Sequence, residues 1–280
     1  MRKLTHFLTI SVASAVVMAS SAFAFDHNRA INLAGKQRML TQKMSKEALM
    51  VANGVNVEEN LKSLQVTRNL FDKTLKGLKD GDSDLGLDKT EKDKIVNQLS
   101  KVETLWKGFD QSISNVTATG AASDADIAAI ASNNIPLLKE MNRGVKLYEA
   151  DAAGSGTNPA LAKAINLAGR QRMLTQKMSK EFMLVSIGHD VSKNKRDLGK
   201  TIALFDNTLN GLIDGDANSG MAGAPNAEIK GQLEKVKGMW LEFRKHVEAE
   251  PSAEAKAAVA AQNLPLLKEM NKAVGMYADL

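Results

Sequence analysis

INLAGKQRMLTQKMSKE occupies residues 31–47, and the same seventeen-residue motif returns at residues 165–181 with one change, Lys36 to Arg170. The rest of the chain also repeats, but with many more substitutions. A stretch that differs once, where its surroundings differ often, serves something more demanding than the filling of a core. The motif is therefore the starting point for both the fold and the function.

The motif belongs to a repeat that runs through the chain. A shift of 134 residues places Trp106 on Trp240. Near the end the shift falls to 129, where LLKEMN at residues 137–142 returns at residues 266–271. The second copy has therefore lost five residues, and the sequence consists of two similar units.

The repeat predicts two domains, residues 25–150 and 151–280, joined near residues 152–157, where the composition is small and flexible. Apolar residues in each copy recur at spacings of three, four and seven, which indicates helices. In the first copy we expect helices near residues 26–52, from residue 56 to about residue 78, at 90–113 and at 124–150. Long helices joined by short loops predict an all-α protein made of two tandem antiparallel up-down four-helix bundles.

Three local signals add detail to these helices. Asn56 is expected to cap the second helix of the first copy, with Glu59 completing a turn that resembles a capping box, and Asp190 takes the same place in the second copy. Pro136 is expected to kink the fourth helix, because its ring removes a backbone donor. Asn134 is expected to bond the carbonyl that this proline leaves free.

The motif divides into two helical faces at 100° per residue. One face carries the apolar residues of a bundle core, which are Leu33, Leu40, Met44 and Val51. The opposite face carries small and polar residues between apolar ones, which are Ile31, Ala34, Gly35, Arg38, Gln42, Ser45 and Leu49, with Ile165, Ala168, Gly169, Arg172, Gln176, Ser179 and Met183 in the second copy. Lys36, Lys43 and Lys46 are expected to reach water on the flanks. Small residues let another backbone approach, so the second face predicts contact between the two motif helices.

Such a contact would bring Arg38 and Arg172 into one poorly solvated seam, where unpaired charge is costly. A small anion between them would remove this cost, since a guanidinium donates parallel hydrogen bonds to a planar oxyanion. The hypothesis assigns the anion to a site built from Gly35, Arg38, Gln42 and Ser45 with Gly169, Arg172, Gln176 and Ser179. The alternative is that each arginine is solvated or paired with a glutamate.

The pattern INLAGxQRMLTQKM resembles the signature at the start of PilJ-type domains, the N-terminal domains of type IV pilus methyl-accepting transducers. It is also similar to the periplasmic nitrate-sensing domain of NarX-type histidine kinases. The resemblance implies a four-helix bundle in which one arginine from each of two bundles grips nitrate, and these arginines match Arg38 and Arg172. Such sensors also carry membrane helices and cytoplasmic signalling regions, neither of which is expected in this sequence.

The N-terminus has the pattern of a secretory signal peptide over residues 1–24, with cleavage expected after Ala24. We therefore expect an exported, soluble periplasmic protein with no membrane span after cleavage. The sequence has no Cys, which excludes disulfides and thiolate chemistry. Its formal net charge of +5 becomes +3 once Arg2 and Lys3 are removed, and no basic block indicates nucleic-acid binding.

Other candidate sites are weaker. Asp80 to Glu91 imitates a calcium loop, but Leu85 replaces the turn glycine, so an acidic loop is the better interpretation. His27, His189 and His246 share no metal-binding spacing, and no nucleophile, phosphate loop or cofactor motif is present, which argues against an enzyme or a metal protein.

Two functions remain open from the sequence. The first is a sensory or ligand-binding protein for a nitrate-like or nitrite-like anion. The second is a helical adaptor that docks a membrane receptor, a pilus-chemotaxis component or a second copy of itself, with no small ligand.

Overall fold

The computed structural model describes residues 25–156 and 158–280, so the expected signal peptide lies outside the described residues. The described part of the chain folds into eight α-helices and one short 3-10 helix. The helices are α1 (His27–Ala52), α2 (Val57–Asp80), α3 (Asp93–Thr119), α4 (Asp124–Gly154), α5 (Pro159–Ser186), α6 (Val191–Asp214), α7 (Ala227–Val247) and α8 (Ala253–Ala278), with η1 (Ser83–Leu85) between α2 and α3.

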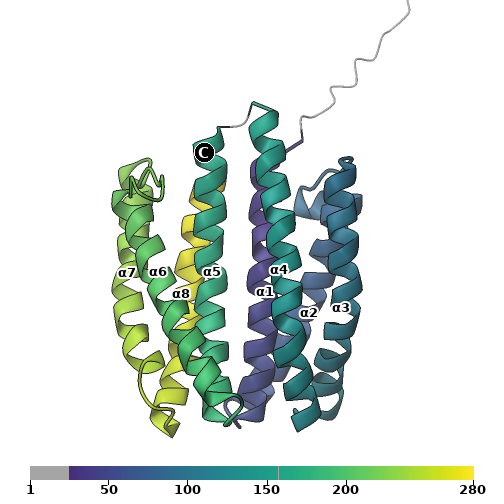
Figure 1. The fold of residues 1–280 in the computed structure, drawn as a ribbon, viewed down its shortest axis with the longest axis vertical. Helices are drawn as coiled ribbons and strands as arrows, with labels where there is room; N and C mark the ends of the chain where they lie inside the picture. The colour runs from purple at the N-terminus through teal and green to yellow at the C-terminus, as the bar shows by residue number, and fades with distance from the viewer. Residues whose placement is uncertain (1–24, 157) are drawn as a thin grey trace, which may run out of the picture.

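Two up-down bundles stand side by side, α1 to α4 in one and α5 to α8 in the other (Figure 1). The helices α1, α4, α5 and α8 line the junction, and α1 lies against α5 along its length. This arrangement confirms the predicted fold class of two tandem helical bundles. Within the described residues, no helix combines the length and the apolar character needed to cross a membrane.

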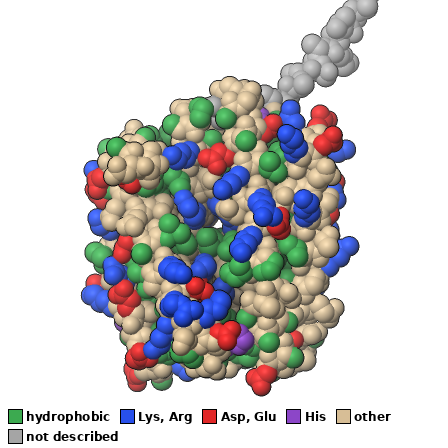
Figure 2. All heavy atoms as spheres, in the orientation of Figure 1, with side chains coloured by type: hydrophobic (Ala, Val, Ile, Leu, Met, Phe, Trp, Pro, Cys, Tyr) green, Lys and Arg blue, Asp and Glu red, His purple; other side chains and the backbone are tan. Residues whose placement is uncertain are grey.

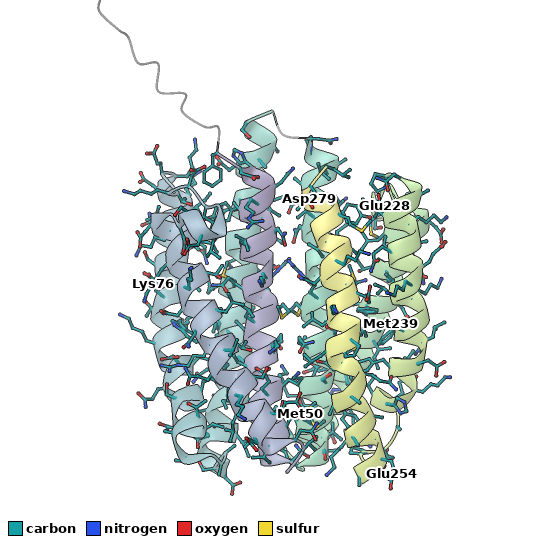
Figure 3. The ribbon with its side chains drawn as sticks, turned by 180° about the vertical axis from the view of Figure 1, so that it is seen from behind. Met50, Lys76, Glu228, Met239, Glu254 and Asp279 are labelled. Atoms are coloured by element: carbon teal, nitrogen blue, oxygen red, sulfur yellow. The ribbon has the colours of Figure 1, made fainter. Side chains whose placement is uncertain are left out.

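Each bundle has an aromatic core that explains part of the repeat. Phe71 and Trp106 pack with ring centroids 4.3 Å apart in the first bundle, and Phe205 and Trp240 do so at 4.5 Å in the second. The indole of Trp106 donates to Asp72 at 3.3 Å, so its polar atom is satisfied at the edge of the core. Seen from behind, Lys76 and Glu228 lie toward the outside of the two bundles, whereas Met50, 1% exposed, lies near the lower end of the junction (Figure 3).

Both faces of α1 and α5 are buried. Leu40 and Met44 are 2% and 0% exposed on the side of their own bundle, and Ile31 is 1% exposed on the side of the other. The prediction that Lys46 reaches water is wrong, because its side chain points into the junction and is 2% exposed. Lys43 is also largely covered, since it pairs with Glu47 and donates to hydroxyl groups on α2.

The predicted caps of α2 and α6 are wrong as well. Asn56 and Asp190 precede these helices, but they adopt left-handed backbone angles, with φ of 43° and 41°, and neither side chain makes a capping hydrogen bond. A tight turn after α1 and α5 requires this backbone, which Asn and Asp tolerate better than most residues. Asn60 closes the first turn instead, by donating to the carbonyls of Val55 and Asn56.

Candidate anion site between the two bundles

Arg38 of α1 and Arg172 of α5 meet in the middle of the junction. A Cβ atom placed on Gly35 would lie 3.3 Å from Arg38 Nη2 and 3.5 Å from Arg172 Nη2, and a Cβ on Gly169 would lie at the same two distances in reverse order. Because both nitrogens lie within 3.5 Å of one point, they are at most about 7 Å apart. The structure therefore brings together the two arginines and the two glycines singled out in the motif.

Each guanidinium is oriented by two neutral acceptors. Arg38 Nη1 donates to Asn142 Oδ1 at 2.7 Å, and Arg172 Nη1 donates to Asn271 Oδ1 at 2.9 Å. These two asparagines end the repeated LLKEMN segments on α4 and α8. The segments thus hold the arginines of the motif, a role that sequence reasoning missed although the second repeat was visible.

The Nη2 atoms reach across the junction. Arg38 Nη2 donates to the carbonyl oxygen of Asn166 on α5 at 3.2 Å, and Arg172 Nη2 donates to that of Asn32 on α1 at 3.0 Å. The two contacts are related by the pseudo-twofold arrangement of the bundles. They tie each motif helix to the other through a charged side chain.

One donor of each guanidinium, the Nε–H group, has no partner in the described structure. The Nε atoms of Arg38 and Arg172 are buried and lack a hydrogen-bond acceptor in the described structure. Nε and Nη2 form the edge of a guanidinium that contacts an oxyanion through two parallel hydrogen bonds. A buried donor without an acceptor is costly, so a further acceptor at Nε would be favourable.

The site carries excess positive charge. Within the described residues, neither Arg38 nor Arg172 makes an ion pair, and burial lowers the pKa of each to about 9, which leaves both charged at neutral pH. Arg170 and Arg172 lower the pKa of Arg38 further, while Glu149 raises it. Burial likewise lowers the pKa of Arg170 and of Lys36, the one position where the motif copies differ. A negatively charged ligand would be favoured here.

The glycines explain why the guanidiniums can lie so close to the helix backbones. A Cβ 3.3 Å from Nη2 is tighter than ordinary contact, so an alanine at Gly35 would displace Arg38 by a few tenths of an ångström. Glycine inside a helix costs about 1 kcal/mol relative to alanine. The two glycines leave room for the guanidiniums next to the helix backbones, and each lowers the stability of its helix by that amount.

The other four residues of the expected site lie in a neighbouring polar layer. Gln42 and Ser45 are 0% exposed and bond Asn134 of α4, at 2.9 Å from Gln42 Nε2 to Oδ1 and at 2.7 Å from Asn134 Nδ2 to Ser45 Oγ. In the second bundle Asn263 Nδ2 donates to Ser179 Oγ at 2.8 Å, and Gln176 donates to Thr175. None of these hydrogen bonds reaches an arginine.

The polar layer also includes two lysines, Lys46, which the sequence predicts in water, and Lys180. Lys46 Nζ donates to Asn263 Oδ1 and Lys180 Nζ donates to Asn134 Oδ1, both at 3.1 Å and both from one bundle to the other. The prediction for Asn134 is therefore wrong: its Nδ2 donates to Thr41 O and Ser45 Oγ of α1 across its own bundle, and its Oδ1 accepts from Lys180.

The acidic loop engages its own neighbourhood. Asp82 accepts a hydrogen bond from the backbone N–H of Leu85 at 3.0 Å, and Asp84 accepts one from Lys73 Nζ at 2.9 Å. No cluster of three His, Cys, Asp or Glu side chains suited to a metal ion occurs among residues 25–156 and 158–280. The loop thus acts as a connection between α2 and α3.

The comparison with known proteins agrees with the geometry. The family model described as the type IV pili methyl-accepting chemotaxis transducer N-terminal domain, PilJ, matches residues 24–131 and again residues 157–265. The chain belongs to the PilJ family. Its two PilJ domains correspond to the two bundles, and the resemblance of the motif to PilJ-type domains is confirmed.

Two relatives of this PilJ-family chain come from Pseudomonas aeruginosa. Protein PilJ is 25% identical over 237 residues, which cover 82% of this chain and 33% of the relative. Methyl-accepting chemotaxis protein McpN is 30% identical over 122 residues, which cover 44% of this chain and 22% of the relative. The chain therefore matches a third or less of the length of either relative.

Proposed function

We propose that this protein is a sensory component that binds one small oxyanion, of the nitrate or nitrite kind, between Arg38 and Arg172. The observation that carries the proposal is the pair of buried guanidiniums within about 7 Å of each other, each with an unpaired Nε and neither with a carboxylate partner in the described structure. Hydrogen bonds of about 2.9 Å to each side let an ion of a few atoms bridge that separation.

The binding step follows from the hydrogen bonds already present. The anion accepts from the Nε and Nη2 edges of both arginines, while Asn142 and Asn271 keep hold of the Nη1 atoms. The carbonyls of Asn32 and Asn166 lie inside α1 and α5, so their oxygens still accept hydrogen bonds within these helices when the arginine contact is broken. Binding thus exchanges the contacts between α1 and α5 for contacts through the ion.

A small ion suits the site better than a large one. Arg38 and Arg172 are each 1% exposed, and the helices that carry them are in close contact at the glycines. A larger ligand would have to separate the bundles and expose apolar residues such as Ile31 and Ile165, which are 1% and 0% exposed. Opening an apolar interface costs about 25 cal/mol for each Å² exposed.

The same proposal extends to location and partner. The family consists of chemotaxis transducer domains, and the N-terminal pattern of residues 1–24 is that of an exported protein. We place the chain in the periplasm, where a change in the contact between α1 and α5 would be passed to a membrane receptor. The relatives contain far more chain than the part matched here, which is consistent with separate sensing and transmitting parts.

Titration calorimetry with sodium nitrate and sodium nitrite, against a sodium chloride background, tests the proposal. We expect saturable heat at or below millimolar anion for the wild type, and none for Arg38→Met/Arg172→Met. Arg68→Met is the control, because Arg68 pairs with Asp110 on the surface and leaves the junction intact. If neither anion gives heat at 10 mM, the adaptor function without a small ligand is the better account.

A further inference from the structure

A second site lies in a groove of about 550 Å³ between α4 of the first bundle and α5 and α6 of the second. These three helices face the viewer in Figure 1, and Figure 2 shows Lys and Arg side chains on both sides of the junction on this face. The volume falls in the range of small-molecule sites. The groove takes no part in the contacts of Arg38 and Arg172.

The two walls of the groove differ in character. The wall from α4 is mainly apolar and includes Ala131, Ile135 and Pro136, to which Leu184 of α5 adds. The wall from α5, α6 and the turn between them is polar and carries Lys180, Glu181, His189, Asp190, Lys193 and Asp197. A ligand with one charged end and a short apolar body would match both walls.

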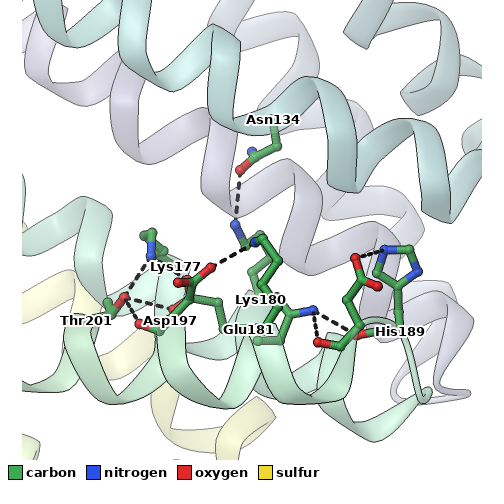
Figure 4. Close-up of polar contacts among 10 residues, drawn as sticks. Asn134, Lys177, Lys180, Glu181, His189, Asp197 and Thr201 are labelled. Carbon is green, nitrogen blue, oxygen red and sulfur yellow. Dashed lines mark hydrogen bonds and ion pairs between the residues drawn. The ribbon is translucent and has the colours of Figure 1, made fainter.

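Lys180 is the central polar group of this groove. Its side chain is 4% exposed, and its ammonium makes one hydrogen bond in the described structure, the 3.1 Å bond to Asn134 Oδ1 (Figure 4). An ammonium group has three donors, so two remain without an acceptor. A carboxylate in the groove would supply both the acceptors and the missing negative charge.

Two of the three carboxylates of the groove are engaged by lysines. Glu181 pairs with Lys177, and Asp197 accepts Lys193 at 2.8 Å. Asp190 lies 3.8 Å from His189 at the rim, where its side chain is 67% exposed.

Two lysines of the groove have no such partner. Lys180 and the exposed Lys139 make no ion pair with any described residue. Two unpaired lysines therefore stand against one carboxylate, Asp190, that no lysine or arginine pairs with, so the unpaired charge at the groove is positive.

We propose that this groove binds a small aliphatic monocarboxylate, with the carboxylate on Lys180 Nζ, Lys139 at the mouth, and the hydrocarbon on Ile135, Pro136 and Leu184. The site is separate from the anion site between the arginines, and it does not depend on the function proposed above. It would give the protein a second input.

The first bundle offers an internal comparison. Lys46 bonds Asn263 as Lys180 bonds Asn134, and burial lowers the pKa of both lysines to about 8. The neighbours differ, because Val55, Asn56, Glu59 and Ser63 stand where the second copy has His189, Asp190, Lys193 and Asp197.

The more distant charges differ accordingly. Glu59 raises the pKa of Lys46, whereas Lys193 lowers that of Lys180 and Asp197 raises it. A carboxylate therefore prefers the groove of Lys180.

The experiment is a titration with sodium butyrate, in the Arg38→Met/Arg172→Met background so that the arginine pair cannot contribute. We expect saturable binding in the millimolar range, loss of at least tenfold in affinity with Lys180→Met, and no change with Lys46→Met. Butyramide, which has the same body without the charge, is expected to give no saturable signal.

Three results would overturn the proposal: no saturable signal with butyrate at 20 mM, equal loss with Lys46→Met and Lys180→Met, or equal binding of butyramide. Lys139 lies on the surface, so Lys139→Ala serves if Lys180→Met fails to fold. It is expected to lower the affinity for butyrate severalfold, and unchanged affinity would count against the site.

Methyl NMR gives an independent measurement. Butyrate should shift the methyl resonances of Ile135 and Leu184 and leave those of their counterparts Leu264 and Met50 unchanged. Shifts at Leu264 and Met50 alone would place the ligand elsewhere.

Discussion

Arg38 and Arg172 each donate a hydrogen bond to the backbone of the helix that carries the other, at 3.2 Å to Asn166 and at 3.0 Å to Asn32. Two positively charged side chains therefore link α1 to α5. Within the described residues, no carboxylate pairs with Arg38 or with Arg172. A junction built this way is sensitive to an added negative charge.

The first prediction concerns stability without ligand. Arg38→Met/Arg172→Met removes two buried charges and keeps most of the volume, so the free energy of unfolding is expected to stay the same or rise, by up to about 4 kcal/mol. Urea denaturation without nitrate measures it. A decrease of more than about 3 kcal/mol in the free energy of unfolding would show that the guanidiniums stabilise the contact between the bundles without a bound ion.

The second prediction concerns the glycines. Gly35→Ala is expected to weaken nitrate binding by fivefold or more, because the new methyl group displaces Arg38 Nη2. Stability should change little or improve by up to about 1 kcal/mol, since alanine favours the helix. Gly108→Ala is the matched control: it also lies inside a helix, but its Cβ would meet open space, so nitrate affinity should stay unchanged. Equal affinities for both variants would argue against the site.

The third prediction concerns pH. Lys46 and Lys180 have a pKa of about 8 in the folded protein, below the usual 10.5, because they are buried. Above pH 8 the unfolded state therefore binds more protons than the folded state, and the free energy of unfolding should rise with pH. Urea denaturation between pH 7 and pH 9.5 measures this rise, and Lys46→Met/Lys180→Met should remove most of it. The same slope in both proteins would contradict the assignment.

The fourth prediction separates the residues that hold the arginines from those in the next layer. Asn142→Leu and Asn271→Leu should each weaken nitrate by threefold or more, because each removes the acceptor that orients an Nη1 atom. Gln42→Leu and Gln176→Leu should leave the affinity within about twofold, since their hydrogen bonds go to other groups. Calorimetry on the four variants decides, and the reverse order of effects would place the ion in the polar layer.

The two faces of the motif explain how much of this could be read from sequence. Helical periodicity separates Leu40 and Met44 from Arg38 and Gly35, and the near-identity of the two copies points to contact between the helices that carry them. The fold class and the meeting of the two arginines follow from that pattern.

The details that sequence reasoning missed depend on distances between helices. The sequence predicts Lys46 in water because lysine is usually exposed, but the junction places Asn263 Oδ1 3.1 Å from its ammonium group. The sequence does not predict that Asn142 orients Arg38, since an asparagine on a helix can equally well face solvent. A capping-box pattern carries no information about a left-handed backbone, so the cap predicted at Asn56 does not form.

The stoichiometry of nitrate binding tests the central claim most directly. If Arg38 and Arg172 form one site, calorimetry on the wild type gives one ion per chain, and Arg38→Met or Arg172→Met alone abolishes the saturable heat. Two ions per chain, or one ion retained after a single substitution, would show that each bundle binds on its own and would contradict a site shared between them.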